Sequence, residues 1–265
     1  MALESGPQSD ECMILIKAQP HRSSRYFETV CCAGVGRDRK WRRQYPVPFR
    51  ILKNDKKFGR WQWISYDFVA PKEDQRRESQ KVLAPSLVAQ EKMKRSERAD
   101  FLAPLVHGTL SEADAAGDSL ALIRPASLNL TAKPKSAKEL TDETRKHEGL
   151  ASQLSLLESD EDVAPLKPCR MAFRVSWTDQ SGGKHTHEND DWETAAAFNR
   201  FERMYGEEKA IVALKEKYEQ QYFEAGLALA FSTHSRRNIE YGTKNQWLLV
   251  GLIRLDESDQ GQLLL

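Results

Sequence analysis

The sequence predicts an α+β protein, with a small OB-like β-barrel at the N-terminus and an antiparallel sheet with two helices at the C-terminus. Three observations support this fold class. Four or five short runs of strand length come first, as in a small barrel. A long polar stretch with an acidic cluster at 158–162 follows, which is typical of a linker. Beyond it, strand-like segments flank two segments with helical spacing, which favours helices on one side of a sheet.

These features divide the chain into three parts. We expect a β-barrel over residues 12–130, a polar linker or mobile helix over 131–165, and an α+β domain over 166–258. The length of 265 residues suits one large or two small domains. The barrel is the part that we expect to bind a partner, because basic charge is concentrated there.

Composition narrows the class of partner. Lys and Arg number 40 against 39 Asp and Glu, so any attraction for a charged partner must come from a local patch. The N-terminus has no basic region followed by an apolar run, and no stretch approaches the roughly 20 apolar residues of a membrane-spanning helix. The adjacent Cys31 and Cys32 would point to opposite faces of a strand and are not expected to pair. We therefore expect a cytoplasmic protein with reduced thiols and no membrane contact.

The sequence predicts some strands of the barrel more clearly than others. The segment 60–69 is the clearest, because large side chains alternate on both of its faces. The segment 41–52 contains Pro46 and Pro48, which cannot donate to a ladder, so it is an edge strand, a bulge or an extended loop. Earlier strands are expected at 13–16 and 28–35. A charged segment at 71–79 leads out of the barrel, and a surface helix is expected over 87–102. We also expect a strand over 119–125, and its return to the first sheet is one of the open alternatives.

A basic and aromatic stretch extends from Arg37 to Phe68. Between Arg37 and Arg60 there are ten Lys or Arg and two acids, a net charge of +8. Six aromatic residues are interleaved with these cations: Trp41, Tyr45, Phe49, Phe58, Trp61 and Trp63. Because cationic side chains neutralise phosphates and flat rings stack on bases, the stretch predicts a surface for DNA or RNA.

Two interpretations of this stretch remain open. In the first, an open groove binds nucleic acid, and its expected binding residues are Arg37, Arg39, Lys40, Trp41, Arg42, Arg43, Arg50, Arg60, Trp61 and Trp63. In the second, the rings fill the barrel core and the charges lie on solvated strands. Burial of all three tryptophans, with the neighbouring cations paired to carboxylates, would favour the second interpretation.

The C-terminal part has more regular patterns. Residues 171–177 alternate as a strand, and the glycines at 182–183 mark a hairpin turn. Asn189 to Asp191 offers N-cap side chains for a helix that ends at Gly206, and a second helix is expected from about 207 to 224. Two apolar runs of strand length follow, at 227–231 and 247–255. The order predicts a strand–strand–helix–helix–strand–strand unit.

One polar cluster contains residue types that carry chemistry. Its members are His185, His187, Glu188, Asp190, Asp191 and Glu193, with Cys169 nearby. Imidazoles and carboxylates are metal ligands and acid–base groups, and two histidines at this spacing share one face of a strand. The paired Cys-x-x-Cys spacing of zinc sites is absent, and the alternative is a polar hairpin followed by a helix cap. We therefore assign no metal, no cofactor and no catalytic residue.

A second polar cluster extends from Thr233 to Arg237 and follows an apolar strand. It predicts either an exposed polar loop or a second loop for phosphate contacts, since hydroxyls and arginines both bind phosphate. The sequence contains no nucleotide-binding glycine loop, nucleophile elbow or zinc-protease motif. That absence weakens the hydrolase, ATPase and dehydrogenase interpretations, and whether the chain is an enzyme stays undecided.

Part of the N-terminal pattern resembles a known group. The run TVCCAG at 29–34, followed by WRRQYPVPFR at 41–50, is similar to a Cys-x-Ala-Gly … Trp-x-Arg-x-Tyr-Pro-x-Pro-Phe-Arg motif. This motif belongs to a bacterial family encoded among mobile-element and defence genes, and it is distantly similar to dual-OB proteins. The resemblance covers about residues 12–80. It implies an OB-like fold and a genetic context more than an activity, and the C-terminal cysteine pairs of some members are missing here.

Three functions from different classes follow. The first is a nucleic-acid-binding accessory protein of a bacterial defence or mobile-element system, with a protein partner as an option for the C-terminal domain. The second is a metal-dependent nuclease or related hydrolase that uses His185, His187, Asp191 and Glu193. The third is a structural subunit whose basic patch binds an acidic protein partner.

Overall fold

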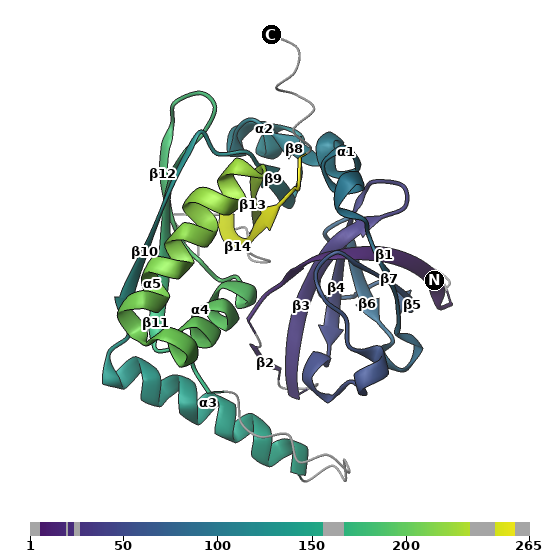
Figure 1. Cartoon of the computed structure of the whole chain (residues 1–265). Helices are drawn as coiled ribbons and strands as arrows, with labels where there is room; N and C mark the ends of the chain where they lie inside the picture. Colours follow the sequence, from purple (N-terminus) through teal and green to yellow (C-terminus); the bar gives the residue numbers. More distant parts are fainter. Residues whose placement is uncertain (1–5, 20, 24–26, 156–166, 234–246, 258–265) are drawn as a thin grey trace. The chain divides into compact units, whose positions relative to one another are not determined.

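The chain forms two units, each built from two separate stretches of sequence. The computed structural model describes residues 6–19, 21–23, 27–155, 167–233 and 247–257 (Figure 1). The first unit combines Met1–Lys92 with Lys133–Ala172, and the second combines Met93–Ala132 with Phe173–Leu265.

A closed barrel of five strands forms most of the first unit (Figure 1). The strands are β1 (Gln8–Lys17), β3 (Phe27–Gly36), β4 (Trp41–Val47), β5 (Gln62–Val69) and β6 (Ser79–Val82). Their order around the barrel is β1-β3-β4-β6-β5, and β1 pairs with β5 to close it. Four of the five pairings are antiparallel and the β4–β6 pairing is parallel. This arrangement confirms the expected OB-like barrel.

Close approach of β1 and β3 depends on a residue without a side chain. A Cβ atom at Gly34 would lie 2.2 Å from the carbonyl oxygen of Met13 and 2.6 Å from Sγ of Cys12. Since real Cβ atoms do not approach other atoms so closely, only glycine lets these strands pair here. The residues of β1 at this point are fully buried, so they belong to the core of the barrel.

Several elements of the expected barrel domain, residues 12–130, differ in the structure. The segment 87–102 is not one surface helix: it contains β7 (Val88–Lys92), which pairs with β5, and the short helices η4 (Arg95–Glu97) and α1 (Arg98–Leu102). Strand pairing overrides the helical spacing of its apolar residues. The charged segment at 71–79 ends in β6, which sequence reasoning missed. The smaller elements are β2 (His21–Ser23), which pairs with β3, and η1 (Phe49–Ile51), η2 (Asn54–Lys56) and η3 (Ala84–Ser86).

The two units do not follow the expected domain boundaries. Residues 93–132 belong to the second unit because β9 (Leu120–Ile123), which is fully buried, pairs with β13 (Leu227–Thr233). The strand expected at 119–125 therefore does not return to the first sheet. The expected linker contains α3 (Ala137–Ser155), a helix of the first unit that contacts β3.

The second unit contains two sheets and several helices. One sheet has the order β10-β11-β12, with β10 (Ser127–Pro134), β11 (Met171–Thr178) and β12 (Lys184–Glu188). The other has the order β14-β13-β9-β8, with β14 (Trp247–Arg254) and β8 (Val106–His107), and only its β8–β9 pairing is parallel. Near β8 the chain also forms η5 (Ala103–Leu105) and α2 (Leu110–Ala115). The six expected C-terminal elements all form, but the four strands among them belong to two different sheets.

The helices of the second unit begin and end as expected. Asp191 caps α4 (Trp192–Tyr205), and Gly206, at φ +83°, separates it from α5 (Glu207–Lys215). A π-helical segment, η6 (Glu216–Tyr222), continues α5. Phe198 of α4, Leu214 of α5 and Tyr218 of η6 are fully buried, and both α4 and η6 contact β14. Tyr205, at the C-terminal end of α4, is half exposed.

Candidate functional sites on the barrel

The three tryptophans of the expected nucleic-acid surface are buried. Trp41, Trp61 and Trp63 are 9%, 6% and 4% exposed. A ring with so little accessible surface offers no open face on which a base could stack. The structure therefore contradicts the open groove that the first interpretation of this stretch requires, and it agrees with rings that pack inside the unit.

Most of the expected cations have partners within the barrel. Nε of Arg42 lies 2.6 Å from Oδ2 of Asp10, and its Nη2 lies 3.2 Å from Oδ2 of Asp38. Burial alone would lower the pKa of Arg42, but hydrogen bonds from it to these two carboxylates raise that pKa above its usual value. Arg60 donates from Nε to the carbonyl oxygen of Leu15 at 2.8 Å. These cations therefore stabilise the fold.

Arg43 forms the most buried of these ion pairs. Its Nη2 lies 3.2 Å from Oε1 of Glu78, and the two side chains are 9% and 6% exposed. The backbone N–H of Arg43 also donates to the carbonyl oxygen of Glu78 at 2.8 Å. Burial lowers the pKa of Arg43, although Glu78 counters this effect. The pair ties β4 to the beginning of β6, where the two strands run parallel.

The remaining expected cations lie at two ends of β4. Arg39 and Lys40 are exposed in the turn before β4, whereas Arg50 is half buried in η1, after β4 ends. Arg39 and Lys40 therefore lie at the opposite end of β4 from Arg50. Arg37 is exposed, but it pairs with Glu11 at 3.0 Å and Glu91 at 3.5 Å.

One exposed ring on β4 was not among the expected binding residues. Tyr45 is 40% exposed and lies on β4, two residues from Arg43, where the pairing with β3 shifts register. The connection between β5 and β6, residues 70–78, ends beside Arg43, because Glu78 pairs with Arg43. Tyr45 belonged to the aromatic set in the sequence, but nothing in the sequence distinguishes its exposure from that of the tryptophans.

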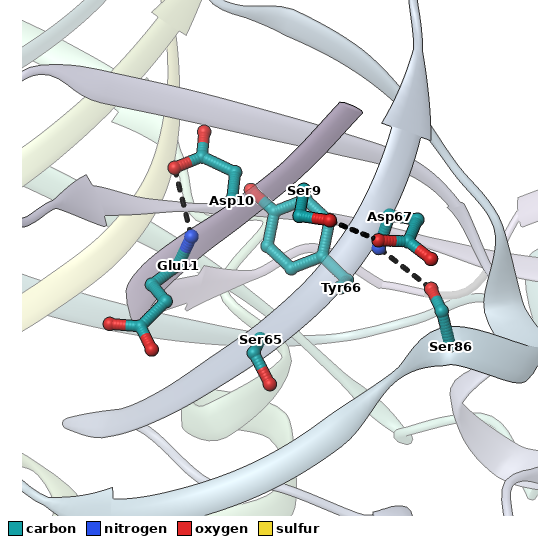
Figure 2. Close-up of a pocket in the computed structure, with 7 residues that line it drawn as sticks. All are labelled: Ser9, Asp10, Glu11, Ser65, Tyr66, Asp67 and Ser86. Carbon is teal, nitrogen blue, oxygen red and sulfur yellow. Dashed lines mark hydrogen bonds between the residues drawn. The ribbon is translucent and has the colours of Figure 1, made fainter. Parts of the chain in front are cut away.

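A polar pocket lies where β1 and β5 pair (Figure 2). Its volume is about 350 Å³, and it is lined by Ser9, Asp10, Glu11, Ser65, Tyr66, Asp67 and Ser86. Figure 2 shows the side chains of Ser9 and Asp67 directed toward each other, with Oγ of Ser9 donating to Asp67 at 2.6 Å. Sequence reasoning missed this pocket because its residues come from three separate segments whose polar positions carry no motif.

A buried hydrogen-bond network lies behind the pocket. Nε2 of Gln44 donates to the hydroxyl of Tyr66 at 3.1 Å, and that hydroxyl donates to Gln80. Gln80 in turn donates to Oδ2 of Asp10 at 2.7 Å. Burial raises the pKa of Tyr66 far above its usual value, so its hydroxyl keeps its proton and remains a donor. The network therefore fixes Asp10 in the pocket wall.

The histidine and carboxylate cluster of the second unit does not assemble a metal site. His185 lies 2.7 Å from Oδ2 of Asp179, and Nε1 of Trp177 donates to Nδ1 of His187 at 3.1 Å. Asp191 caps α4 instead. The two histidines do share one face, since both stack on Trp177. Across the described ranges, no three His, Cys, Asp or Glu side chains lie close enough to hold a metal ion.

The second polar cluster is described only at its first residue. Thr233 is buried at the end of β13, and residues 234–237 lie outside the described residues. As for membranes, none of the helices in the described part of the chain combines the length and the apolar character that a bilayer crossing requires.

The fold and these surfaces define a two-unit protein with an OB-like barrel and an α+β unit. A family model described as "Domain of unknown function (DUF8757)" matches residues 104–264, which is more than half of the chain, so the protein belongs to the DUF8757 family. A second model, described as "Domain of unknown function (DUF8758)", matches residues 8–104, which include the barrel strands. A comparison with curated proteins finds no match.

Proposed function

We propose that this chain is a nucleic-acid-binding accessory protein whose barrel contacts single-stranded DNA or RNA along β3 and β4. OB-type barrels bind oligonucleotides on the face formed by their second and third strands, which are β3 and β4 in the order of the barrel. The observation that supports the proposal most is the exposed ring of Tyr45 on β4, one of these two strands. A single exposed aromatic side chain gives one stacking position for a base, whatever its sequence.

Cations beside this face would hold the phosphates. Arg39 and Lys40 are exposed before β4, and Lys72 and Arg77 are exposed in the connection between β5 and β6. That connection also contains Arg76 and the three acids Glu73, Asp74 and Glu78, so its three positive charges are balanced by three negative ones. We therefore expect few phosphate contacts and a modest affinity. A role in bacterial defence or mobile elements is part of the proposal only through the sequence resemblance.

The substitution Tyr45→Ala tests the stacking role. Loss of one base–ring contact should weaken binding of a fluorescent single-stranded oligonucleotide about 5- to 100-fold, measured by anisotropy. The matched control is Tyr205→Ala, which removes another exposed tyrosine, on α4. Equal affinities of wild type and Tyr45→Ala, or equal losses in both variants, would reject the proposed face.

The nuclease alternative gains no support from the site geometry. Its four expected residues have separate roles in a hairpin and a helix cap. We therefore do not propose a hydrolytic function. The structural-subunit alternative required an exposed basic patch, and several of its cations are paired with carboxylates within the barrel.

A further inference from the structure

Arg37 occupies a site whose chemistry suits a guanidinium group. The guanidinium carbon lies 3.8 Å from the ring centroid of Trp63. On the same group, Nε lies 3.0 Å from Oε2 of Glu11, and Nη2 lies 3.5 Å from Oε1 of Glu91. An aromatic face combined with carboxylates is the arrangement that recognises a planar, permanently charged cation. The barrel thus holds an arginine from its own chain in this way.

The polar pocket adjoins this occupied site. Glu11 belongs to both, because it pairs with Arg37 and also lines the pocket. The cross-strand register places Glu11 opposite Ser65 and Ser9 opposite Asp67, so the pocket extends along the two strands away from Trp63. A second cation that enters the pocket would therefore lie beside the guanidinium of Arg37, with carboxylates around both.

The pocket has acceptor capacity that the chain does not use. Within the described ranges, the carboxylate of Asp67 accepts one hydrogen bond, from Ser9, and forms no ion pair. An ionised carboxylate can accept about four hydrogen bonds. Ser65 adds a hydroxyl for which the described residues provide no hydrogen-bond partner. The pocket therefore favours a ligand that carries several N–H donors and a positive charge.

Hydrogen bonds within the chain already hold side chains of the pocket in place without a ligand. Asp10 accepts from Arg42 at 2.6 Å and from Gln80 at 2.7 Å. Ser86 donates to the carbonyl oxygen of Leu83 and accepts from the backbone N–H of Asp67, both at 2.7 Å. Side chains that are already held in place lose little conformational entropy on binding, which favours affinity.

We propose that this pocket binds an arginine side chain from a basic segment of a partner protein. A volume of about 350 Å³ is at the lower end of the range for ligand pockets and accommodates one long side chain. Phosphate groups do not fit, because Asp10, Glu11 and Asp67 line the pocket and would repel them. The site lies along β1 and β5, so the inference does not depend on nucleic-acid binding at β3 and β4.

A peptide pair tests the proposal with the full-length protein. The probe is a fluorescein-labelled peptide with two arginines among glycine and serine, and its partner carries citrulline, which has the same shape without the charge. We expect the arginine peptide to bind about tenfold or more tightly than the citrulline peptide. The substitution Asp67→Asn should weaken binding of the arginine peptide about fivefold or more. Asparagine keeps an oxygen for the bond from Ser9.

Two further variants make the result decisive. Asp142→Asn removes an exposed acid on α3 and should leave the affinity unchanged. Ser65→Lys places a cation of the chain itself in the pocket and should abolish binding even if Asp67→Asn folds poorly. Equal binding of the two peptides, an equal loss in Asp67→Asn and Asp142→Asn, or no binding to the wild type would overturn the proposal. Tyr45→Ala should retain peptide binding, so the two binding proposals fail separately.

Discussion

Arg43 and Glu78 show how single charged residues support the fold of the barrel. Arg43 lies in the stretch whose charge, in the sequence, indicates a binding surface, and Glu78 lies ten residues beyond the end of that stretch. In the structure their side chains are nearly inaccessible to solvent and pair with each other. A buried ion pair of this kind need not add stability compared with apolar residues, but an unpaired member costs much free energy. The two charges therefore interact with each other in the interior of the barrel.

Removal of one member of this pair should destabilise the first unit. We expect Glu78→Ala to lower the free energy of unfolding by about 3 kcal/mol, because it leaves Arg43 buried without its carboxylate. Urea denaturation followed by tryptophan fluorescence measures the change. The double variant Arg43→Met with Glu78→Leu should recover most of the loss, and a double variant as unstable as the single one would contradict this account.

Asp179 controls the hairpin between β11 and β12. Its carboxylate accepts hydrogen bonds from the hydroxyl of Ser181 at 2.7 Å, the ring of His185 at 2.7 Å and two backbone N–H groups. The hydrogen bond from Ser181, followed by that from His185, holds the pKa of Asp179 well below its usual range. The carboxylate therefore stabilises the folded state only while it is ionised.

This depressed pKa predicts a pH-dependent loss of stability. Above the unfolded pKa of about 3.9, wild type should exceed Asp179→Asn by about 2 kcal/mol, since hydrogen bonds to charged groups are strong. The difference should shrink as the pH falls through the lower folded pKa, because both states then bind the proton. Denaturation from neutral to acidic pH measures it. A difference that grows toward low pH would contradict the assigned role.

At the scale of elements, the N-terminus of α4 is tied to the neighbouring sheet through one carboxylate. Asp191 accepts from the backbone N–H of Glu193 and the hydroxyl of Thr194, and it also accepts from the N–H of Leu252 in β14 at 3.3 Å. The Asp191 side chain is buried, so these donors have no water to replace it. The helix cap and the contact between α4 and β14 therefore depend on the same group.

Asp191→Ala should cost more than the loss of an ordinary helix cap. Caps contribute about 0.5–2 kcal/mol, and the buried N–H of Leu252 adds a further penalty, so we expect a loss of about 3 kcal/mol. Thr109→Ala, which removes the cap of the short helix α2, should cost about 1 kcal/mol. Thermal unfolding of both variants compares them, and equal losses would show that the contact with β14 contributes nothing.

Local patterns predicted the elements whose signals lie close together in the sequence. The alternation at 60–69, the cap at Asp191 and the end of α4 at Gly206 all appear in the structure. Long-range pairing was not predictable: β6 is short and polar, and β9 joins a strand more than 100 residues away. The burial of several expected binding residues was not predictable for the same reason. The sequence shows that Arg43 is charged, but not that Glu78 lies against it.

At the scale of the whole molecule, the charge is nearly balanced, with a formal net value of +1. Long-range attraction for a polyanion therefore cannot come from the total charge. In our account, the two sides of the barrel have different preferences: the β3–β4 side stacks a base on Tyr45, and the β1–β5 side accepts a cation in an acidic pocket. Such a barrel would connect a nucleic acid to a basic protein segment.

The salt dependence of oligonucleotide binding tests the central claim most directly. The dissociation constant of a labelled single-stranded oligonucleotide is measured by anisotropy between about 50 and 200 mM salt. With about two or three phosphate contacts, the logarithm of the association constant should fall with that of the salt concentration at a slope between about −1.4 and −2.1. Tyr45→Ala should weaken binding without changing this slope. No binding at the lowest salt concentration, or an affinity that does not change with salt, would contradict the account.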